Sequence, residues 1–241
     1  MIELFLLGII VGLLSGFFGI GGGTVSVPFL LMFGYDIKTA IGISVVQMVF
    51  SSIYGSYVNN KKGTLDKALV VFIGTGGFVG ALFSGYVSDA LSSEVLELVF
   101  LSFVVFALIR VFFTPKQQPQ KELPNRFLLF GLGFFVGCVS MSVGVGGSLL
   151  LVPILVGFLH VELKKAISAG LFFVVFSSIS GLISHTLSGE IDYEKGVILG
   201  LVSLFGVYVG IHFKDKVDSK IQKRLLIVFY TFIICYLVFR S

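Results

Sequence analysis

The chain has 241 residues, of which 56% are hydrophobic and only 12% are charged. Soluble domains carry about 25% charged residues, so this composition and a mean hydropathy of +1.05 exclude a soluble fold. The net charge of +4 and the two cysteines also exclude a disordered chain, a nucleic-acid-binding role and a disulfide framework. A spanning helix needs about 20 residues, which leaves room for about eight to ten spans. The expected fold class is therefore all-α, a polytopic transmembrane helical protein.

Stretches without charged residues follow one another along the whole chain. They cover 4–35, 39–60, 68–88, 98–109, 127–161, 166–189, 196–213 and 225–239. Because lipid offers no hydrogen-bond partners to the backbone, each stretch is predicted to be helical. The first stretch has no basic segment before it and is too long for the core of a signal peptide. We therefore expect it to remain in the membrane.

Two of these stretches, 4–35 and 127–161, are too long for one span, since 35 helical residues cover about 52 Å against a hydrocarbon core of about 30 Å. Each contains a glycine cluster, which costs helix propensity and permits positive φ. The clusters read Gly19-Ile20-Gly21-Gly22-Gly23-Thr24 and Gly144-Val145-Gly146-Gly147-Ser148. We predict in each stretch a full helix, a break and a short helix of about ten residues, with Pro28 and Pro153 as structural hinges.

The chain is expected to consist of a first repeat (1–113), a cytoplasmic linker rich in proline and glutamine (114–126) and a second repeat (127–241). At an offset of 125, Gly19 aligns with Gly144 and Pro28 with Pro153. After one extra residue the offset is 126, and the sequence FSSI at 50–53 recurs at 176–179. One insertion over about a hundred positions indicates gene duplication.

The charges of equivalent loops predict two inverted repeats, each with one broken-helix hairpin and three further spans. Loop 59–67 is basic and its partner 186–195 is acidic, whereas loop 89–94 is acidic and its partner 213–224 is basic. By the positive-inside rule, equivalent loops then lie on opposite sides of the membrane. The loops placed in the cytoplasm (59–67, 110–126, 160–165 and 213–224) hold 14 of the 17 Lys and Arg residues. The expected location is a bacterial inner membrane, with the N-terminus and the C-terminus outside.

Inverted repeats with a broken helix at the same place are typical of transporters whose substrate site lies near the midplane. Each break exposes the first N–H groups of a short helix, and these groups, with the helix dipole, bind anions. Gln47, in the middle of a span, either contacts the ligand or links helices, and its repeat equivalent is Phe173. The candidate substrate-binding residues are Gly19, Gly21, Gly22, Gly23, Thr24, Gln47, Gly144, Gly146, Gly147 and Ser148. The alternative is that the glycines only let helices pack closely.

Several chemistries have no support in the sequence. No carboxylate lies in the middle of a predicted span, which weakens coupling to protons or sodium ions. The chain has no Walker A, HExxH or GxSxG motif, and its three histidines and two cysteines form no metal-binding pattern. We therefore expect no enzyme activity, cofactor or metal. The expected partners are a small anion and the lipid bilayer, without nucleic acid, and the oligomeric state stays open.

The sequence GLLSGFFGIGGGTVSVPFLL at 12–31, followed by AIGIS at 40–44, resembles the TauE/SafE family of bacterial membrane transporters. GCVSMSVGVGGSLLLVPIL at 137–155 resembles the corresponding motif in the second half of that family. The resemblance covers essentially the whole chain and implies export of sulfite or organosulfonates. This chain departs from strict symmetry where Ser148 stands opposite Gly23 and Ser168 opposite Gly42, so the two half-sites are expected to be inequivalent.

The expected function is a membrane transporter that moves a small anion, sulfite or an organosulfonate, out of the cell. Alternating access around a midplane site is the expected mechanism. Two alternatives stay open: an anion channel with a pore lined by the same glycines, and a membrane subunit of a larger complex.

Overall fold

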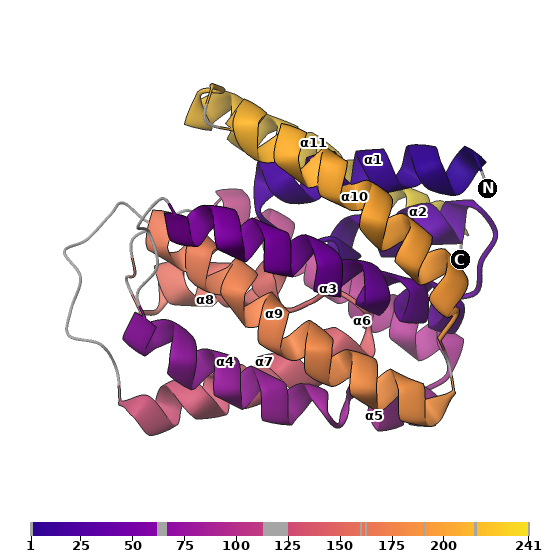
Figure 1. The fold of residues 1–241 in the computed structure, drawn as a ribbon, viewed down its shortest axis with the longest axis horizontal. Coiled ribbons are helices and arrows are strands. Elements are labelled where there is room, and N and C mark those ends of the chain that lie inside the picture. The colour runs from indigo at the N-terminus through magenta and orange to yellow at the C-terminus, as the bar shows by residue number, and fades with distance from the viewer. Residues whose placement is uncertain are drawn as a thin grey trace.

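The computed structural model describes residues 2–61, 67–112, 125–159, 161, 163–189, 191–214 and 216–240. Within these ranges the chain is all-helical, without strands, as the composition predicts (Figure 1). The helices are α1 (Ile2–Phe18), α2 (Gly23–Met32), α3 (Ile37–Lys61), α4 (Lys67–Ala81), α5 (Ser84–Ala90), α6 (Ser93–Phe112), α7 (Arg126–Ser142), α8 (Ser148–Gly157), α9 (Leu163–Ser188), α10 (Tyr193–Lys214) and α11 (Ser219–Arg240). Most of the expected linker, 114–124, lies outside the described residues.

Five helices, α3, α6, α9, α10 and α11, are long and apolar enough to cross a membrane. A sixth span is formed if α4 and α5, which are bent by 41° relative to each other, are counted together. The total is below the eight to ten spans expected, because α1 and α7 have 17 residues each and α2 and α8 have ten each. A complete crossing needs about 20 residues. The six longer spans agree with the number expected beside the two broken stretches.

Helices from the two halves of the chain pack against each other in pairs. α1 lies along α10, and α4 lies along α7 (Figure 1). Glycines bring the paired backbones together: a Cβ added at Gly137 of α7 would lie 2.5 Å from the carbonyl oxygen of Gly77 in α4. A Cβ added at Gly12 of α1 would overlap the carbonyl oxygen of Ser203 in α10. Close packing therefore explains the glycines inside these helices, as small-residue interfaces do in membranes.

The outer surface of the bundle is apolar. Leu98, Phe135, Phe205 and Val228, from four different helices, are each 64% to 66% exposed. Such a surface is unfavourable in water and suits contact with lipid. Both chain termini lie at the same end of the bundle (Figure 1). The chain is therefore a multi-pass membrane protein whose buried core is enclosed by lipid-facing helices.

Candidate functional site

Both predicted glycine breaks are present. Between α1 and α2, Gly19 and Gly21 have φ of 68° and 76°. Between α7 and α8, the glycines 144, 146 and 147 have φ of 69°, 79° and 84°. These values lie in the left-handed region, which residues with a Cβ rarely adopt, so glycine is what allows the chain to turn here. The short helices have ten residues each, as predicted, and Pro28 and Pro153 lie inside them.

The two short helices start without a side-chain cap. Thr24 and Ser148 stand near these starts, yet neither α2 nor α8 has an N-cap hydrogen bond from a side chain. The helical hydrogen bonds begin with the N–H of Val25 in α2 and of Leu150 in α8. The preceding N–H groups belong to Gly23, Thr24, Ser148 and Leu149. Uncapped N–H groups at a helix start are donors for a negatively charged ligand.

The two breaks touch each other, although they are about half the chain apart in sequence. The Ser148 hydroxyl donates a hydrogen bond of 2.5 Å to the backbone carbonyl of Ile20. A Cβ added at Gly23 would overlap the carbonyl oxygen of Gly144. The structure thus brings together the glycine clusters that the sequence predicts to form one site.

Apolar side chains also pack against the breaks. A Cβ added at Gly146 would lie 2.6 Å from the sulfur of Met48 in α3 and 3.2 Å from Val174 in α9. Val174 also lies 3.6 Å from a Cβ added at Gly21. The repeat register makes Met48 and Val174 equivalent residues, since they are 126 positions apart. In this conformation they pack the breaks tightly on the side of α3 and α9.

Gln47 lies against the first break. Its side chain is fully buried, and its Nε2 donates a 3.1 Å hydrogen bond to the Ser203 hydroxyl. Its Oε1 has no hydrogen-bond partner, and neither has the buried Thr24 hydroxyl. A Cβ added at Gly22 would overlap that Oε1. Buried polar atoms without a partner are rare in folded proteins and cost about 1–3 kcal/mol each. Of the two, the Thr24 hydroxyl can donate to an anion, whereas the Gln47 Oε1 can only accept a hydrogen bond.

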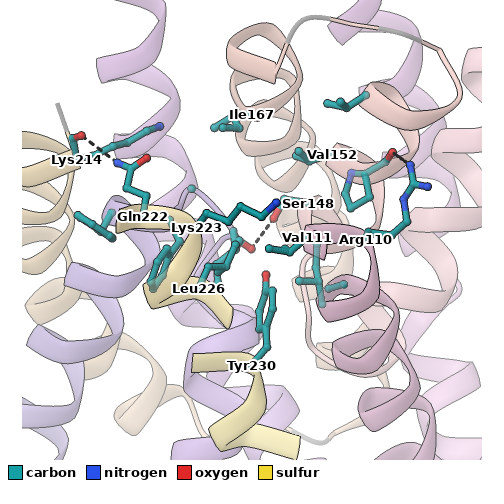
Figure 2. A pocket seen from close by; sticks show the side chains of 18 residues that line it. Arg110, Val111, Ser148, Val152, Ile167, Lys214, Gln222, Lys223, Leu226 and Tyr230 are labelled. Atoms are coloured by element: carbon teal, nitrogen blue, oxygen red, sulfur yellow. Dashed lines mark hydrogen bonds between the residues drawn. The ribbon is translucent and has the colours of Figure 1, made fainter. Parts of the chain in front are cut away.

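A cavity of about 350 Å³ reaches the breaks from one end of the bundle (Figure 2). It lies between the ends of α1, α6 and α10 and the starts of α8 and α11. Of the ten predicted substrate-binding residues, Gly19 and Ser148 line it. The other eight, which are Gly21, Gly22, Gly23, Thr24, Gln47, Gly144, Gly146 and Gly147, are buried and do not line this cavity.

Three basic side chains, from Arg110, Lys214 and Lys223, line the cavity, and its lining contains no acidic residue. Figure 2 shows the Lys223 ammonium group pointing toward Ser148. The Lys214 ammonium group is 3.9 Å from a Cβ added at Gly19. Arg110 donates a 3.2 Å hydrogen bond to the carbonyl of Pro153, and its buried Nε has no partner. The cavity is therefore positively charged next to the start of α8.

Tyr230 of α11 closes the cavity from below Ser148. Its side chain is only 2% exposed, and Figure 2 shows its hydroxyl pointing into the cavity. Sequence reasoning assigned neither Tyr230 nor the three basic residues to the site. In the sequence, the charges of the three basic residues indicate only the orientation of the loops. Nothing in the sequence indicates that the end of α6 lies beside the start of α11.

The described residues offer no alternative metal centre. They contain no group of three His, Cys, Asp or Glu side chains placed to hold a metal ion. His185 is buried with its Nε2 at 3.3 Å from the carbonyl oxygen of Met141, so it contacts backbone. Cys138 and Cys235 are both free.

The sequence matches the profile of a known protein family. The sequence profile described as "Sulfite exporter TauE/SafE" matches residues 4–237. The chain belongs to this family. Because the match covers both breaks, all the spans and nearly the whole length, the TauE/SafE assignment applies to the complete fold described here.

Individual relatives agree with the TauE/SafE assignment. The chain is 25% identical to the probable membrane transporter protein YunE of Bacillus subtilis, over 100% of this chain and 98% of the relative. It is 26% identical to the probable membrane transporter protein YdhB of the same organism, over 94% of each. It is 34% identical to the sulfite exporter TauE/SafE family protein 5 of Arabidopsis thaliana, over 38% of this chain and 21% of the relative. No solved structure shows a significant match. The protein is a membrane transporter of the TauE/SafE family, and its relatives are named as transporters and not as enzymes.

Proposed function

We propose that this TauE/SafE protein moves a small anion, sulfite or an organosulfonate, out of a bacterial cell across the inner membrane. The observation that carries the proposal is the positively charged cavity that leads to the uncapped start of α8. Sulfite export is also what the name of the matching family states. The proposed substrate rests on that name together with the charge of the cavity.

The charges divide the path of the anion into two steps. Arg110, Lys214 and Lys223 attract an anion into the cavity, because cations in a low-dielectric cleft raise the local concentration of negative ligands. Farther in, backbone N–H groups at the helix starts would hold it, assisted by the helix dipoles. The side chains that lie against Gly22 and Gly147 are uncharged, so the anion would be bound there without being trapped.

The same charges support the proposed orientation. The cavity opens between the end of α10 and the start of α11, which flank the basic segment 213–224. The positive-inside rule places that segment in the cytoplasm. The two termini, which share one end of the bundle, would then lie outside, as the loop charges predict. In this proposed orientation the described conformation would be open toward the side from which an exported anion is taken.

Alternating access requires two repeats of related structure. The starts of α3, α4 and α6 recur 126 residues later as the starts of α9, α10 and α11, and α2 and α8 start 125 residues apart. This spacing supports the division into repeats 1–113 and 127–241. The breaks would then form one central site, to which the candidate residues Gly19, Gly21, Gly22, Gly23, Thr24 and Gln47 contribute from the first repeat and Gly144, Gly146, Gly147 and Ser148 from the second.

Transport of radiolabelled sulfite into proteoliposomes tests the proposal. Lys223→Gln removes a cation that points at Ser148, so we expect the KM for sulfite to rise by about fivefold to tenfold. Lys220→Gln is the matched control: it removes the same charge from the same helix at an exposed position outside the cavity lining. Its KM should stay within about twofold of the wild-type value.

Two further variants test the breaks. Gly22→Leu and Gly147→Leu fill the two equivalent positions and should abolish sulfite binding in protein that is still inserted in the membrane. Unchanged affinity in both variants would remove the half-helix site. Ohmic single-channel steps in place of slow, saturable flux would identify a channel instead of a carrier.

A further inference from the structure

The regular spacing of the helix starts gives each cavity residue a counterpart in the other repeat. Residues of α8 correspond to residues of α2 at an offset of 125. Residues of α9, α10 and α11 correspond to those of α3, of α4 with α5, and of α6 at an offset of 126. By this register the counterparts of the cavity lining come from α2, the starts of α3 and α6, the ends of α5, α7 and α11, and the second glycine break. The inference that follows rests on the proposed function, because it needs the two repeats to be inverted.

The counterpart residues are packed together, whereas the residues that they correspond to surround an open cavity. All of them are buried except Glu97 and Tyr236, whereas more than half of the cavity residues are partly or fully exposed. Leu96, Phe100 and Ile233, the counterparts of Gln222, Leu226 and Ala107, are each at most 1% exposed. They belong to one apolar cluster in the interior. The same set of positions is therefore hollow around one break and packed around the other.

The two ends of the contact between α6 and α11 show where this difference arises. The cavity lies between residues 107–111 at the end of α6 and residues 222–226 at the start of α11. At the other end of the same pair, Leu96 and Phe100 of α6 share the apolar cluster with Ile233 and Leu237 of α11. A tilt of α6 against α11 would close the first gap and open the second.

Unpartnered hydroxyl groups mark the closed region. In the described residues three buried hydroxyls have no hydrogen-bond partner, those of Thr24, Ser56 and Ser88. Thr24 and Ser88 are the counterparts of the cavity residues Leu149 and Lys214. A buried hydroxyl without a partner is unfavourable in a permanently packed interior, and it becomes favourable once water or an anion reaches it. Two of the three therefore lie where an opening would satisfy them.

We infer that the counterparts form a second vestibule, closed in this conformation, which opens on the face of the bundle that holds the termini. The same small anion would leave through it, passing Thr24 at the start of α2. The open cavity and the closed vestibule would be formed by equivalent positions of the two repeats. In each conformation only one of the two would be open.

The two vestibules differ in charge, and the difference favours release. Glu97 stands where the open cavity has Lys223, Ser88 where it has Lys214, and Tyr236 where it has Arg110. The three cations attract an anion into the open cavity. At the equivalent positions of the second vestibule the anion would meet no cation and one carboxylate, that of Glu97. The affinity of the second vestibule for the anion is then lower, which favours release of the anion on that side.

Accessibility of introduced cysteines tests the inference. The background carries Cys138→Ser and Cys235→Ser, which removes both native thiols. Thr24→Cys and Ser88→Cys place a thiol in the closed vestibule. A membrane-impermeant methanethiosulfonate reagent is applied from the face of the termini, with and without methanesulfonate in the compartment that the cavity faces. This organosulfonate is used because sulfite attacks the reagent and cleaves the mixed disulfide that the reagent forms. We expect methanesulfonate to raise the modification rate of both cysteines by about tenfold, because turnover populates the other state.

The matched control is Ser56→Cys, which also replaces a buried hydroxyl without a partner. Its counterpart, Leu182, does not line the cavity, so its modification rate should not change. If Thr24→Cys does not insert, Val27→Cys replaces it, since its counterpart Val152 lines the cavity. Because Thr24 is itself a candidate substrate-binding residue, transport is judged on the Ser88→Cys protein. If that protein transports the anion and neither cysteine becomes reactive from either face, the second vestibule is overturned and the proposed function stands. If the cysteines react but the Ser88→Cys protein shows no saturable transport of sulfite or methanesulfonate, the proposed substrate is overturned, and failure of both overturns both proposals.

Discussion

The two glycine breaks have nearly the same sequence, yet their surroundings differ. At the first break, Gly22 is in the right-handed region, with φ of −68° and ψ of −34°, and the amide of Gln47 lies against it. At the second, the equivalent Gly147 is left-handed, with φ of 84°, and the ring of Phe173 lies against it. Gln47 and Phe173 are themselves equivalent residues. One break is therefore lined by a polar side chain and the other by an aromatic one.

The first position of the two short helices differs as well. Gly23 starts α2 and has no space for a side chain, whereas Ser148 starts α8 and uses its hydroxyl to bind the carbonyl of Ile20. The cavity reaches Ser148 but not Gly23. Both halves thus contain the backbone break, while the contacts around it differ. The inequivalence expected from Ser148 extends to the side chains around both breaks.

The largest effect is expected at Gly147. Gly147→Ala forces a Cβ into a left-handed position, which costs about 1–2 kcal/mol, and overpacking against Phe173 adds about 1–3 kcal/mol. Thermal unfolding in detergent, followed by circular dichroism, measures the loss. Phe173→Ala in the same chain should not restore stability, because the backbone strain remains and a cavity is added. A double variant as stable as the wild type would show that only the ring contact matters at this break.

A slightly smaller effect is expected from Gly23→Ala. Its Cβ would overlap a backbone carbonyl of the second break, which cannot move aside as a side chain can, so we expect a loss of about 1–3 kcal/mol. Ser148→Ala at the equivalent position creates no overlap and loses one hydrogen bond, for about 1 kcal/mol. Equal losses in the two variants would mean that the breaks are more alike than their contacts indicate.

The backbone of both breaks was predictable from the sequence, but the side chains around them were not. A glycine cluster inside a long charge-free stretch predicts a break directly, because local conformation decides where a helix stops. The bend between α4 and α5 was missed, since the stretch 68–88 has no proline or charge to mark it. It coincides with contacts from distant residues, such as the 2.8 Å hydrogen bond from the Gly85 N–H to the Ser184 hydroxyl.

The cavity depends on tertiary packing in the same way. Arg110 and Tyr230 are 120 residues apart, and only the contact between α6 and α11 makes them line one space. Sorting charges by loop predicted which end of each span is basic. It gave no information about which helix ends meet, so the basic residues of the cavity could not be assigned to a site.

At Gly22 we expect a loss of stability that a second substitution can restore. Its backbone is already right-handed, so Gly22→Ala causes no backbone strain, and its Cβ overlaps only the end of the Gln47 side chain. We expect a loss of about 1–2 kcal/mol, which Gln47→Ala in the same chain should largely restore. Double-variant melting curves measure the recovery. A recovery no better than that of the Gly147 and Phe173 pair would contradict the difference between the breaks.

The smallest effect on stability, and the most informative one for function, is expected from Gln47→Met. Methionine has a similar volume and removes the unpartnered Oε1, while Ser203 keeps its 2.7 Å hydrogen bond to the carbonyl of Gly200. We therefore expect the free energy of unfolding to change by less than about 1 kcal/mol. Sulfite transport should fall by about tenfold or more, because the Gln47 amide offers an oxyanion an N–H donor beside the helix start and methionine offers none.

Phe173→Leu is the control for that variant, because it changes the equivalent residue of the other repeat. It should lower stability through lost packing, by about 1 kcal/mol, and leave the KM for sulfite unchanged. The opposite pair of results, a destabilised Gln47→Met protein with normal transport, would make Gln47 a link between α3 and α10 through Ser203. The polar first break would then hold the helices together, and the second break, which the cavity already reaches, would bind the anion alone.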